Sequence, residues 1–331
     1  MTNHTPDPHP LDHLTASARF HDYRYASNPL AEGSTGEVPL ARFDAELHER
    51  GGTRVLVLDN SVALGCSGPA TSPGLCASFV RVRAGEGIVT DANATSQLFF
   101  VMRGAGTSTH VEGDPATPSI PWKAGDLFTL PARSRMLHAA TDDAALYWVH
   151  DEPLLRYLGA EATGRQFSPT LYRREAILEA LDGVLRDPSS ATANRLSVLL
   201  ANRLFPQTMT ITHVIWAMFG LLPVGAVQAP HRHQSVALDL VVDARPGCYT
   251  MVGRTLDRDG SIKDGIRVDW KPHSAFVTPP GLWHSHHNES GQPAHILPIQ
   301  DAGLHTFLRT LNILFSRRTK DGGHDVVERA G

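Results

Sequence analysis

Three histidines in the last third of the chain have the residue type and the spacing of a metal site. His231 and His233 are separated by one residue, and His284 follows further along the chain. In an extended strand, residues i and i+2 point to the same face, so the first two imidazoles would lie side by side. Three nitrogen ligands would leave coordination positions open for a substrate or for oxygen. We therefore predict that these three histidines bind one metal ion.

The segment between these histidines must fold back on itself to bring them together. It contains alternating apolar sequence at 237–242, 249–252 and 275–277, which predicts antiparallel strands. Of His286 and His287, one is expected to face the pocket and the other to be solvated. A single histidine here would be explained more simply as a surface or core residue, but three in one pattern favour a site.

The same segment resembles the two sequence motifs of cupin barrels, G-x5-H-x-H and P-x-G-x2-H-x3-N. The residues that match them are Gly225, His231, His233, Pro279, Gly281, His284 and Asn288. The acidic residue that usually closes the first motif is not at its usual place, and Asp239 is the nearest candidate, one position late. The resemblance implies a small barrel whose interior holds the metal.

The first half of the chain resembles a second cupin without metal ligands. Strand patterns occur at 77–82 and 97–102, and the stretch 125–131 resembles the turn and strand that precede a cupin's second motif. The stretch 91–97, where His-x-His would be expected, contains no histidine, and only His138 remains near the second motif. We expect this barrel to have a structural role.

These patterns predict an all-β protein with accessory helices, a bicupin made of two fused jelly-roll barrels. Helical periodicity at 168–186 and 304–315 predicts two of the helices. The expected parts are a flexible N-terminal arm (1–35), a metal-free cupin (36–160), a helical linker (161–205) and a metal-binding cupin with a C-terminal helix (206–331).

Composition argues against several kinds of partner and location. The formal net charge is −4 and charges of both signs are interspersed, so neither nucleic acid nor a membrane is an expected partner. No stretch resembles a secretory signal or a membrane span. The three cysteines, Cys66, Cys76 and Cys248, lack paired spacing, which fits a reducing compartment. We expect a cytoplasmic protein.

The second half also resembles the bicupin dioxygenases that open the rings of gentisate, salicylate and 1-hydroxy-2-naphthoate. The matching stretches are His231-Arg-His-Gln-Ser-Val-Ala-Leu and Thr278-Pro-Pro-Gly-Leu-Trp-His-Ser-His286. The resemblance implies Fe(II) as the cofactor, a small hydroxylated aromatic acid and O2 as substrates, and a homo-oligomer, either a dimer or a tetramer. In that family the metal-bearing cupin comes first and the empty one second, whereas this chain has the reverse order.

The same resemblance assigns roles to residues around the metal. Arg195 would orient the substrate carboxylate, Trp216 and Trp283 would contact the substrate, and His286 would donate a hydrogen bond or move protons. Where the family has an arginine that helps to hold the carboxylate, this chain has Asp239.

Asp239 therefore has several possible roles. It could accept a hydrogen bond from a hydroxyl or amino substituent of the substrate, pair with Arg195, or approach the metal as a fourth ligand. A solvated or salt-bridged carboxylate at a strand end is the simpler alternative.

Two other functions stay open. One is a cupin metalloenzyme of another reaction type, such as a decarboxylase, an isomerase or an aminophenol dioxygenase. The other is a sensor that binds a small aromatic ligand without turning it over, although no DNA-binding motif accompanies it. Oxygen uptake on addition of substrate would separate the dioxygenase from a sensor.

Overall fold

The computed structural model describes residues 14–114 and 116–328. The chain divides into two units, Met1–Glu37 and Val38–Gly331. The described part of the first unit contains one short helix, α1 (Tyr23–Ala26), capped by the Asp22 carboxylate, which accepts a hydrogen bond from the backbone N–H of Arg24. Residues 1–13, the first part of the expected arm, lie outside the described residues.

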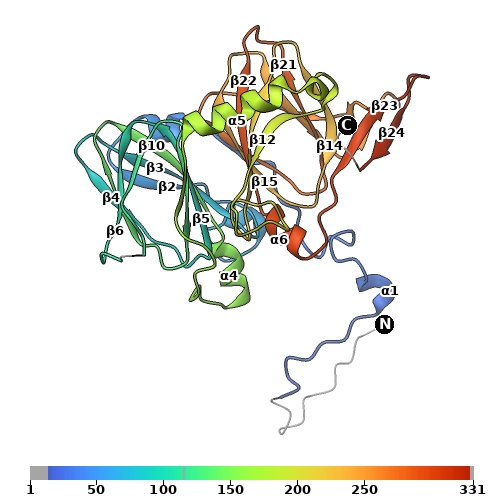
Figure 1. Cartoon of the computed structure of the whole chain (residues 1–331). Helices are drawn as coiled ribbons and strands as arrows, with labels where there is room; N and C mark the ends of the chain where they lie inside the picture. The colour runs from blue at the N-terminus through green and yellow to red at the C-terminus, as the bar shows by residue number, and fades with distance from the viewer. Residues whose placement is uncertain (1–13, 115, 329–331) are drawn as a thin grey trace. The chain divides into compact units, whose positions relative to one another are not determined.

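Two antiparallel sheets form the first barrel (Figure 1). One sheet has the order β11 (Thr170–Tyr172), β8 (Leu127–Pro131), β5 (Ser96–Arg103), β10 (Ala144–His150), β3 (Cys76–Val82) and β2 (Arg54–Val57). The other has the order β4 (Gly87–Thr90), β9 (Met136–Ala140), β6 (Ala105–His110) and β7 (Ile120–Lys123). Aromatic rings fill the interior: the ring of Phe99 stacks 4.9 Å from that of Phe128 and 5.6 Å from that of Trp148.

The second barrel is built in the same way. Its first sheet has the order β1 (Arg42–Phe43), β20 (Ala275–Thr278), β15 (Ala237–Asp243), β22 (Ala294–Gln300), β13 (Trp216–Leu222) and β12 (Leu196–Leu200). The other has the order β19 (Ile266–Asp269), β16 (Cys248–Gly253), β21 (Trp283–Asn288), β14 (Val227–Arg232), β23 (Leu314–Arg318) and β24 (His324–Val327). A small ribbon joins β17 (Thr255–Leu256) to β18 (Ile262–Lys263). The predicted all-β fold with two barrels is confirmed.

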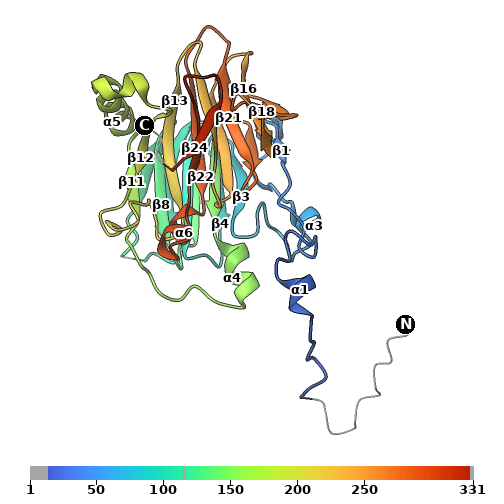
Figure 2. The same ribbon diagram turned by 90° about the vertical axis from the view of Figure 1, so that its right-hand side faces the viewer.

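Strands from outside each barrel's own stretch of sequence complete the sheets. β1 precedes the first barrel in the chain but pairs with β20 of the second. The expected helical linker supplies β11 to the first barrel and β12 to the second. Between them lie α5 (Arg174–Arg186), which packs along β12 (Figure 2), and the 3-10 turn η1 (Pro188–Thr192). The linker is thus only partly helical, because its ends add strands to open sheet edges.

The C-terminal segment differs from the predicted helix over 304–315. Helix α6 (Ala302–Phe307) is short, and Arg309 adopts a left-handed φ of 61° soon after its end. The chain then becomes β23, in which Phe315 pairs with His231 of β14. Pairing with the open edge of β14 outweighs the helical periodicity of the sequence, since tertiary contacts commonly override local propensity.

The remaining helices are short: α2 (Glu46–Glu49), α3 (Ser61–Leu64) and α4 (Glu152–Leu158). None of the helices in the described part of the chain is both long and apolar enough to cross a membrane.

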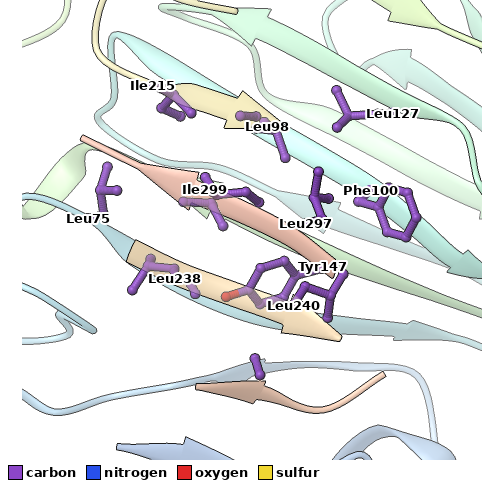
Figure 3. Close-up of a cluster of buried hydrophobic side chains, with 14 of the residues drawn as sticks. Leu75, Leu98, Phe100, Leu127, Tyr147, Ile215, Leu238, Leu240, Leu297 and Ile299 are labelled. Atoms are coloured by element: carbon purple, nitrogen blue, oxygen red, sulfur yellow. The ribbon is translucent and has the colours of Figure 1, made fainter. Parts of the chain in front are cut away.

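The largest buried cluster lies where the six-stranded sheet of the first barrel faces the sheet of the second barrel that contains β15 and β22. Figure 3 shows Leu98, Phe100, Leu127 and Tyr147 of the first barrel against Ile215, Leu238, Leu240, Leu297 and Ile299 of the second. Side chains alternate along a strand, so Asp239, between Leu238 and Leu240, points the other way, into the second barrel. The core between the barrels therefore sets which residues of β15 can reach a site in the second barrel.

Candidate active site

Strands β14 and β21 bring the three predicted ligands together. They are antiparallel neighbours, with His231 opposite His284. The turn before β21 contains Gly281 at a φ of 77°, and its N–H donates to the carbonyl of His233 at 2.7 Å, which ties the turn to the end of β14. The ring centroid of His284 lies 4.0 Å from that of His231 and 4.9 Å from that of His233. Each of the three histidines is only 3% exposed.

In all three rings a hydrogen bond to a backbone carbonyl decides which nitrogen carries the hydrogen. The Nδ1 atoms of His231, His233 and His284 lie 3.2, 2.8 and 3.2 Å from the backbone carbonyls of Ala229, Ser235 and Leu282. A carbonyl can only accept, so in each ring Nδ1 carries the hydrogen and Nε2 keeps its lone pair. This is the tautomer in which a histidine binds a metal through Nε2.

Burial also keeps these rings neutral. It is the largest cause that lowers the pKa of His233 to about 4, and it lowers the pKa of His231 and His284 well below the ordinary value, with neighbouring histidines adding to the effect. Near neutral pH all three imidazoles are therefore unprotonated at Nε2, as metal binding requires.

The fourth histidine, His286, faces the same interior but is held differently. Its ring centroid lies 5.9 Å from that of His284, and its Nδ1 is bonded to the hydroxyl of Thr250 at 2.8 Å instead of to a carbonyl. His287 points to the opposite face of β21, where its ring stacks 4.5 Å from that of Tyr249. Of the two histidines, His286 is the one that faces the pocket.

Arg195 is brought to the histidines from the start of β12. Its Nη2 donates to Nε2 of His231 at 3.2 Å, and its Nη1 lies 2.8 Å from Sδ of Met218. Burial of the guanidinium lowers the pKa of Arg195 to about 10, while the charge of Asp239 acts in the opposite direction. The group stays cationic at neutral pH and places a charged donor at the edge of the histidine cluster.

Asp239 is enclosed in the second barrel rather than solvated at a strand end. It is 2% exposed, and the hydroxyl of Thr278 donates to its Oδ2 at 2.6 Å. Burial raises the pKa of Asp239 to about 6, opposed by the Thr278 hydrogen bond and the charge of Arg195. The charges of Arg195 and Asp239 influence each other, and the only side-chain hydrogen bond to the carboxylate within the described residues comes from Thr278.

The two tryptophans expected to contact substrate lie in different places. Trp216 begins β13, where its neighbour Ala217 packs in the core between the barrels, so Trp216 faces the interior. Trp283 lies on the opposite face of β21 from His284, with its ring 4.9 Å from the guanidinium of Arg232. The structure therefore corrects the expectation for Trp283: strand alternation turns the residue next to a ligand away from the site.

A cavity of about 210 Å³ adjoins the histidine cluster. Arg195, Gln228, Trp270 and His286 line it together with Gly220 and Ile296. Gln228 is 6% exposed, and its Nε2 has no hydrogen-bond partner within the described residues. A buried amide without a partner is costly, and because Gln228 lines the cavity, a bound ligand can supply the missing acceptor.

Sequence reasoning missed Gln228 because of a bulge. Gln228 lies three positions before His231, and in a regular strand residues three positions apart point to opposite faces, so the sequence predicts that Gln228 points away from the site. The pairing of β14 with β21 shifts between these two residues, and Gln228 lies opposite His286. A β-bulge re-aims side chains in this way. Pro230, which lies between Gln228 and His231, is the sequence signal for an irregular strand, because proline within a sheet is confined to edge strands, to the first residue of a strand or to bulges.

A larger cavity, of about 740 Å³, lies on the outer face of the same sheet. Its lining includes Ser285 and His287 of β21 and Phe315 of β23. Ser285 and His287 alternate with His284 and His286, so this part of the cavity lining lies on the face of β21 opposite to the histidine cluster.

The residues present fit a divalent metal bound by nitrogen. Three neutral rings with inward Nε2 lone pairs form a donor set suited to such ions. In this structure, Nε2 of His231 accepts from Arg195, and across residues 14–114 and 116–328 no three His, Cys, Asp or Glu side chains are arranged as a formed metal centre. Metal binding therefore requires Arg195 to release His231.

Two jelly-roll barrels, with a histidine cluster in one of them, define a bicupin. No family model matches the chain. Solved structures that match include salicylate 1,2-dioxygenase of Pseudoaminobacter salicylatoxidans with gentisate, at a TM-score of 0.65 and 15% identity over 94% of this chain and 95% of that one. Another structure of that enzyme matches at a TM-score of 0.63 and 16% identity, over 83% and 87% of the two chains. The shared bicupin fold thus extends along nearly the whole chain.

Two curated proteins are similar in sequence. One is 1-hydroxy-2-naphthoate 1,2-dioxygenase of Nocardioides sp. strain KP7, 27% identical over 180 residues, which are 54% of this chain and 42% of that protein. The other is gentisate 1,2-dioxygenase 1 of Aquipseudomonas alcaligenes, 29% identical over 148 residues, which are 44% of this chain and 39% of that protein. The match thus spans about two fifths of each relative's length. By fold and by sequence, the chain is related to the bicupin ring-cleaving dioxygenases.

Proposed function

We propose that the protein is a non-haem Fe(II) dioxygenase that opens the ring of a hydroxylated aromatic acid, of the gentisate, salicylate or substituted-salicylate class, with O2. The observation that carries the proposal is that three buried histidines share one tautomer, in which Nε2 can bind a metal. All three carry the hydrogen on Nδ1 and keep the Nε2 lone pair for a metal. The cationic Arg195, which is hydrogen-bonded to His231, lines a neighbouring cavity together with His286. The named activities of the two curated relatives support the same chemistry.

In this proposal His231, His233 and His284 hold the iron. Bound Fe(II) supplies open positions for the substrate oxygens and O2, and a route for electrons between them. Arg195 exchanges its hydrogen bond to His231 for the substrate carboxylate, which its planar guanidinium can hold through two donors. Gln228 and His286 line the same cavity and orient the ring through their polar atoms.

The size of the cavity favours an acid with a single ring. A cavity of roughly 150 Å³ is enough to hold benzene, and the volume here is about 210 Å³. A substituted benzoate therefore fits this volume better than a hydroxynaphthoate. The negative charge of the buried Asp239 acts on Arg195, which lines the cavity, and this favours substrates with one carboxylate over those with a second.

Asp239 is also the observation that favours another reaction type. An acidic group in place of the family's arginine suits a cupin metalloenzyme acting on an aminophenol, or a decarboxylase or isomerase. A sensor that binds an aromatic ligand without turnover is the remaining alternative. All of these keep the metal, so they differ from the main proposal in oxygen consumption or in product.

Reconstitution with iron tests the proposal directly. Metal-free protein is loaded anaerobically with Fe(II) and given salicylate, gentisate, amino-, nitro- or halosalicylates, or hydroxynaphthoates in an oxygen electrode. We expect one O2 consumed per substrate, a new ultraviolet chromophore of the opened ring, and faster turnover of one-ring acids than of hydroxynaphthoates. If iron binds but no compound consumes oxygen, the dioxygenase proposal is wrong and a different reaction or a sensor takes its place.

Gln228 offers a second test, in which binding and stability should move in opposite directions. Gln228→Leu removes a donor without a partner from a residue that lines the cavity, and one neutral hydrogen bond contributes about 0.5–1.5 kcal/mol. We expect KM to rise about threefold to tenfold with little change in kcat. The metal-free variant should be at least as stable as the wild type, because a buried amide without a partner is removed. A clear loss of stability in thermal unfolding would show that Gln228 has a structural role instead.

A further inference from the structure

We infer that Thr250 and Trp270 are positioning residues that fix the tautomer of His286, so that its Nε2 carries a hydrogen and donates it into the cavity. The effect of this tautomer on catalysis rests on the proposed function, whereas the assignment of the tautomer does not depend on it. The inference starts from the one difference between His286 and the three ligand histidines, which is the partner of Nδ1.

The partners of Thr250 decide where the hydrogen of His286 lies. The indole N–H of Trp270 donates to Oγ1 of Thr250 at 2.8 Å, and the same oxygen lies 2.8 Å from Nδ1 of His286. An indole nitrogen can only donate, so Thr250 accepts from Trp270 and its own hydrogen is left to point at Nδ1. No other acceptor for that hydrogen occurs among the described residues. His286 therefore accepts at Nδ1 and carries its hydrogen on Nε2.

This arrangement is the reverse of that in the ligand histidines. His231, His233 and His284 carry the hydrogen on Nδ1 and present a lone pair, whereas His286 presents an N–H group. An Nε2 that carries a hydrogen cannot bind a metal, but it can donate to an anionic oxygen. We call the chain of hydrogen bonds from Trp270 through Thr250 to His286 the relay. The relay makes one histidine of the cluster a hydrogen-bond donor, while the other three keep the lone pairs of metal ligands.

The first barrel contains the same relay. The indole N–H of Trp122 donates to Oγ of Ser108 at 2.9 Å, and Ser108 lies 2.6 Å from Nδ1 of His138. The strand pairing is equivalent, since Ser108 lies opposite His138 as Thr250 lies opposite His286.

The two relays end differently. In the first barrel, Nε2 of His138 is 2.8 Å from Oγ1 of Thr90, so the donor is satisfied within the protein. In the second barrel the cavity borders His286, and none of the described protein groups is hydrogen-bonded to its Nε2. In the first barrel the relay thus ends on a protein hydroxyl. In the second barrel it ends at the cavity, and this difference points to a bound ligand as the acceptor for Nε2 of His286.

Thr250→Val tests the relay, because valine has nearly the shape of threonine without its hydroxyl. In metal-free protein labelled with 15N at histidine, long-range 1H–15N spectra distinguish the two tautomers, and His286→Gln identifies the His286 signals. We expect the wild type to show the Nε2–H form and Thr250→Val to show a mixture or the Nδ1–H form. Thr250→Ser should keep the wild-type signals, since a serine hydroxyl, that of Ser108, contacts Nδ1 of the equivalent histidine in the first barrel.

Turnover of the iron-loaded protein gives the second readout. A positioned proton donor contributes about 10²- to 10⁴-fold to rate, and a partial loss of the donor form should lower kcat about tenfold to a hundredfold in Thr250→Val, with KM changed less than about threefold. Thr250→Ser should restore kcat. Ser108→Ala, the matched change in the first barrel, should alter the His138 signals and leave kcat unchanged.

The outcomes separate this inference from the proposed function. An unchanged His286 tautomer in Thr250→Val would overturn the relay, and a changed tautomer with unchanged kcat would overturn its role in catalysis. If the wild type turns over no aromatic acid, the proposed function fails while the spectra still decide the relay. Should Thr250→Val not fold, Trp270→Phe removes the first donor of the relay, and the same loss of the Nε2–H form is expected.

Discussion

Replacing His284 by glutamine is expected to abolish metal binding while the barrel still folds. His284 is the ligand closest to both others, with ring centroids 4.0 and 4.9 Å away. Glutamine keeps a polar side chain in the buried position but cannot offer an imidazole lone pair. Changes in residues that merely support metal ligands cost about 10- to 100-fold in affinity or activity, so loss of a ligand should exceed that. Metal analysis after dialysis should fall from about one ion per chain to a trace.

His287→Gln is the matched control for this prediction. It lies on the same strand, three residues further on, but on the opposite face, where its ring stacks on Tyr249 and its Nε2 bonds to Ser285. Metal content and turnover should stay at the wild-type level. Undiminished metal in His284→Gln, or equal loss in both variants, would contradict the assignment of the ligands, and thermal unfolding of metal-free protein would show whether either variant is misfolded.

The periodicity of a strand explains which site residues could be predicted from sequence. His231 and His233 share a face by the i, i+2 rule, and the matching rule for His284 and His286 places both in the interior. The same rule places Trp283, which stands beside His284 in the family pattern, on the other face of β21. A motif records neighbours along the chain, whereas a β-strand sends neighbours to opposite faces.

Residues whose placement depends on the rest of the fold could not be predicted in this way. Gln228 reaches the cavity because of a local bulge in β14. Pro230 indicates an irregularity in this strand, but a proline does not show which side chains the bulge re-aims. The segment 314–318 is a strand because β14 has a free edge, and its helical periodicity gives no hint of that edge. The relay from Trp270 through Thr250 spans two strands, so nothing in local spacing identifies it.

Asp239 carries the second large expected effect, which concerns stability and its dependence on pH. Burial raises the pKa of this carboxyl in the folded protein to about 6, above the ordinary value of 3.8. Below about pH 4 the group is protonated in both the folded and the unfolded state and costs nothing. Between about pH 4 and 6 the unfolded state ionises first, so folding stability falls as pH rises, by about 3 kcal/mol in all at 1.36 kcal/mol per unit.

Asp239→Asn removes this titration and keeps an oxygen that can accept from Thr278. The free energy of unfolding of the metal-free variant, relative to wild type, should therefore rise between pH 4 and 6 and stay up to about 3 kcal/mol higher at pH 8.

Urea unfolding at several pH values measures this difference between variant and wild type, in which the contributions of the other titrating groups cancel. Asp269→Asn, at an exposed carboxylate paired with Arg267, is the control and should change the free energy of unfolding at pH 7 by no more than about 0.5 kcal/mol. A difference for Asp239→Asn that does not change with pH would mean that the Asp239 carboxylate is already stabilised as an anion in the folded barrel. Loss of metal from the variant would instead identify Asp239 as a fourth ligand.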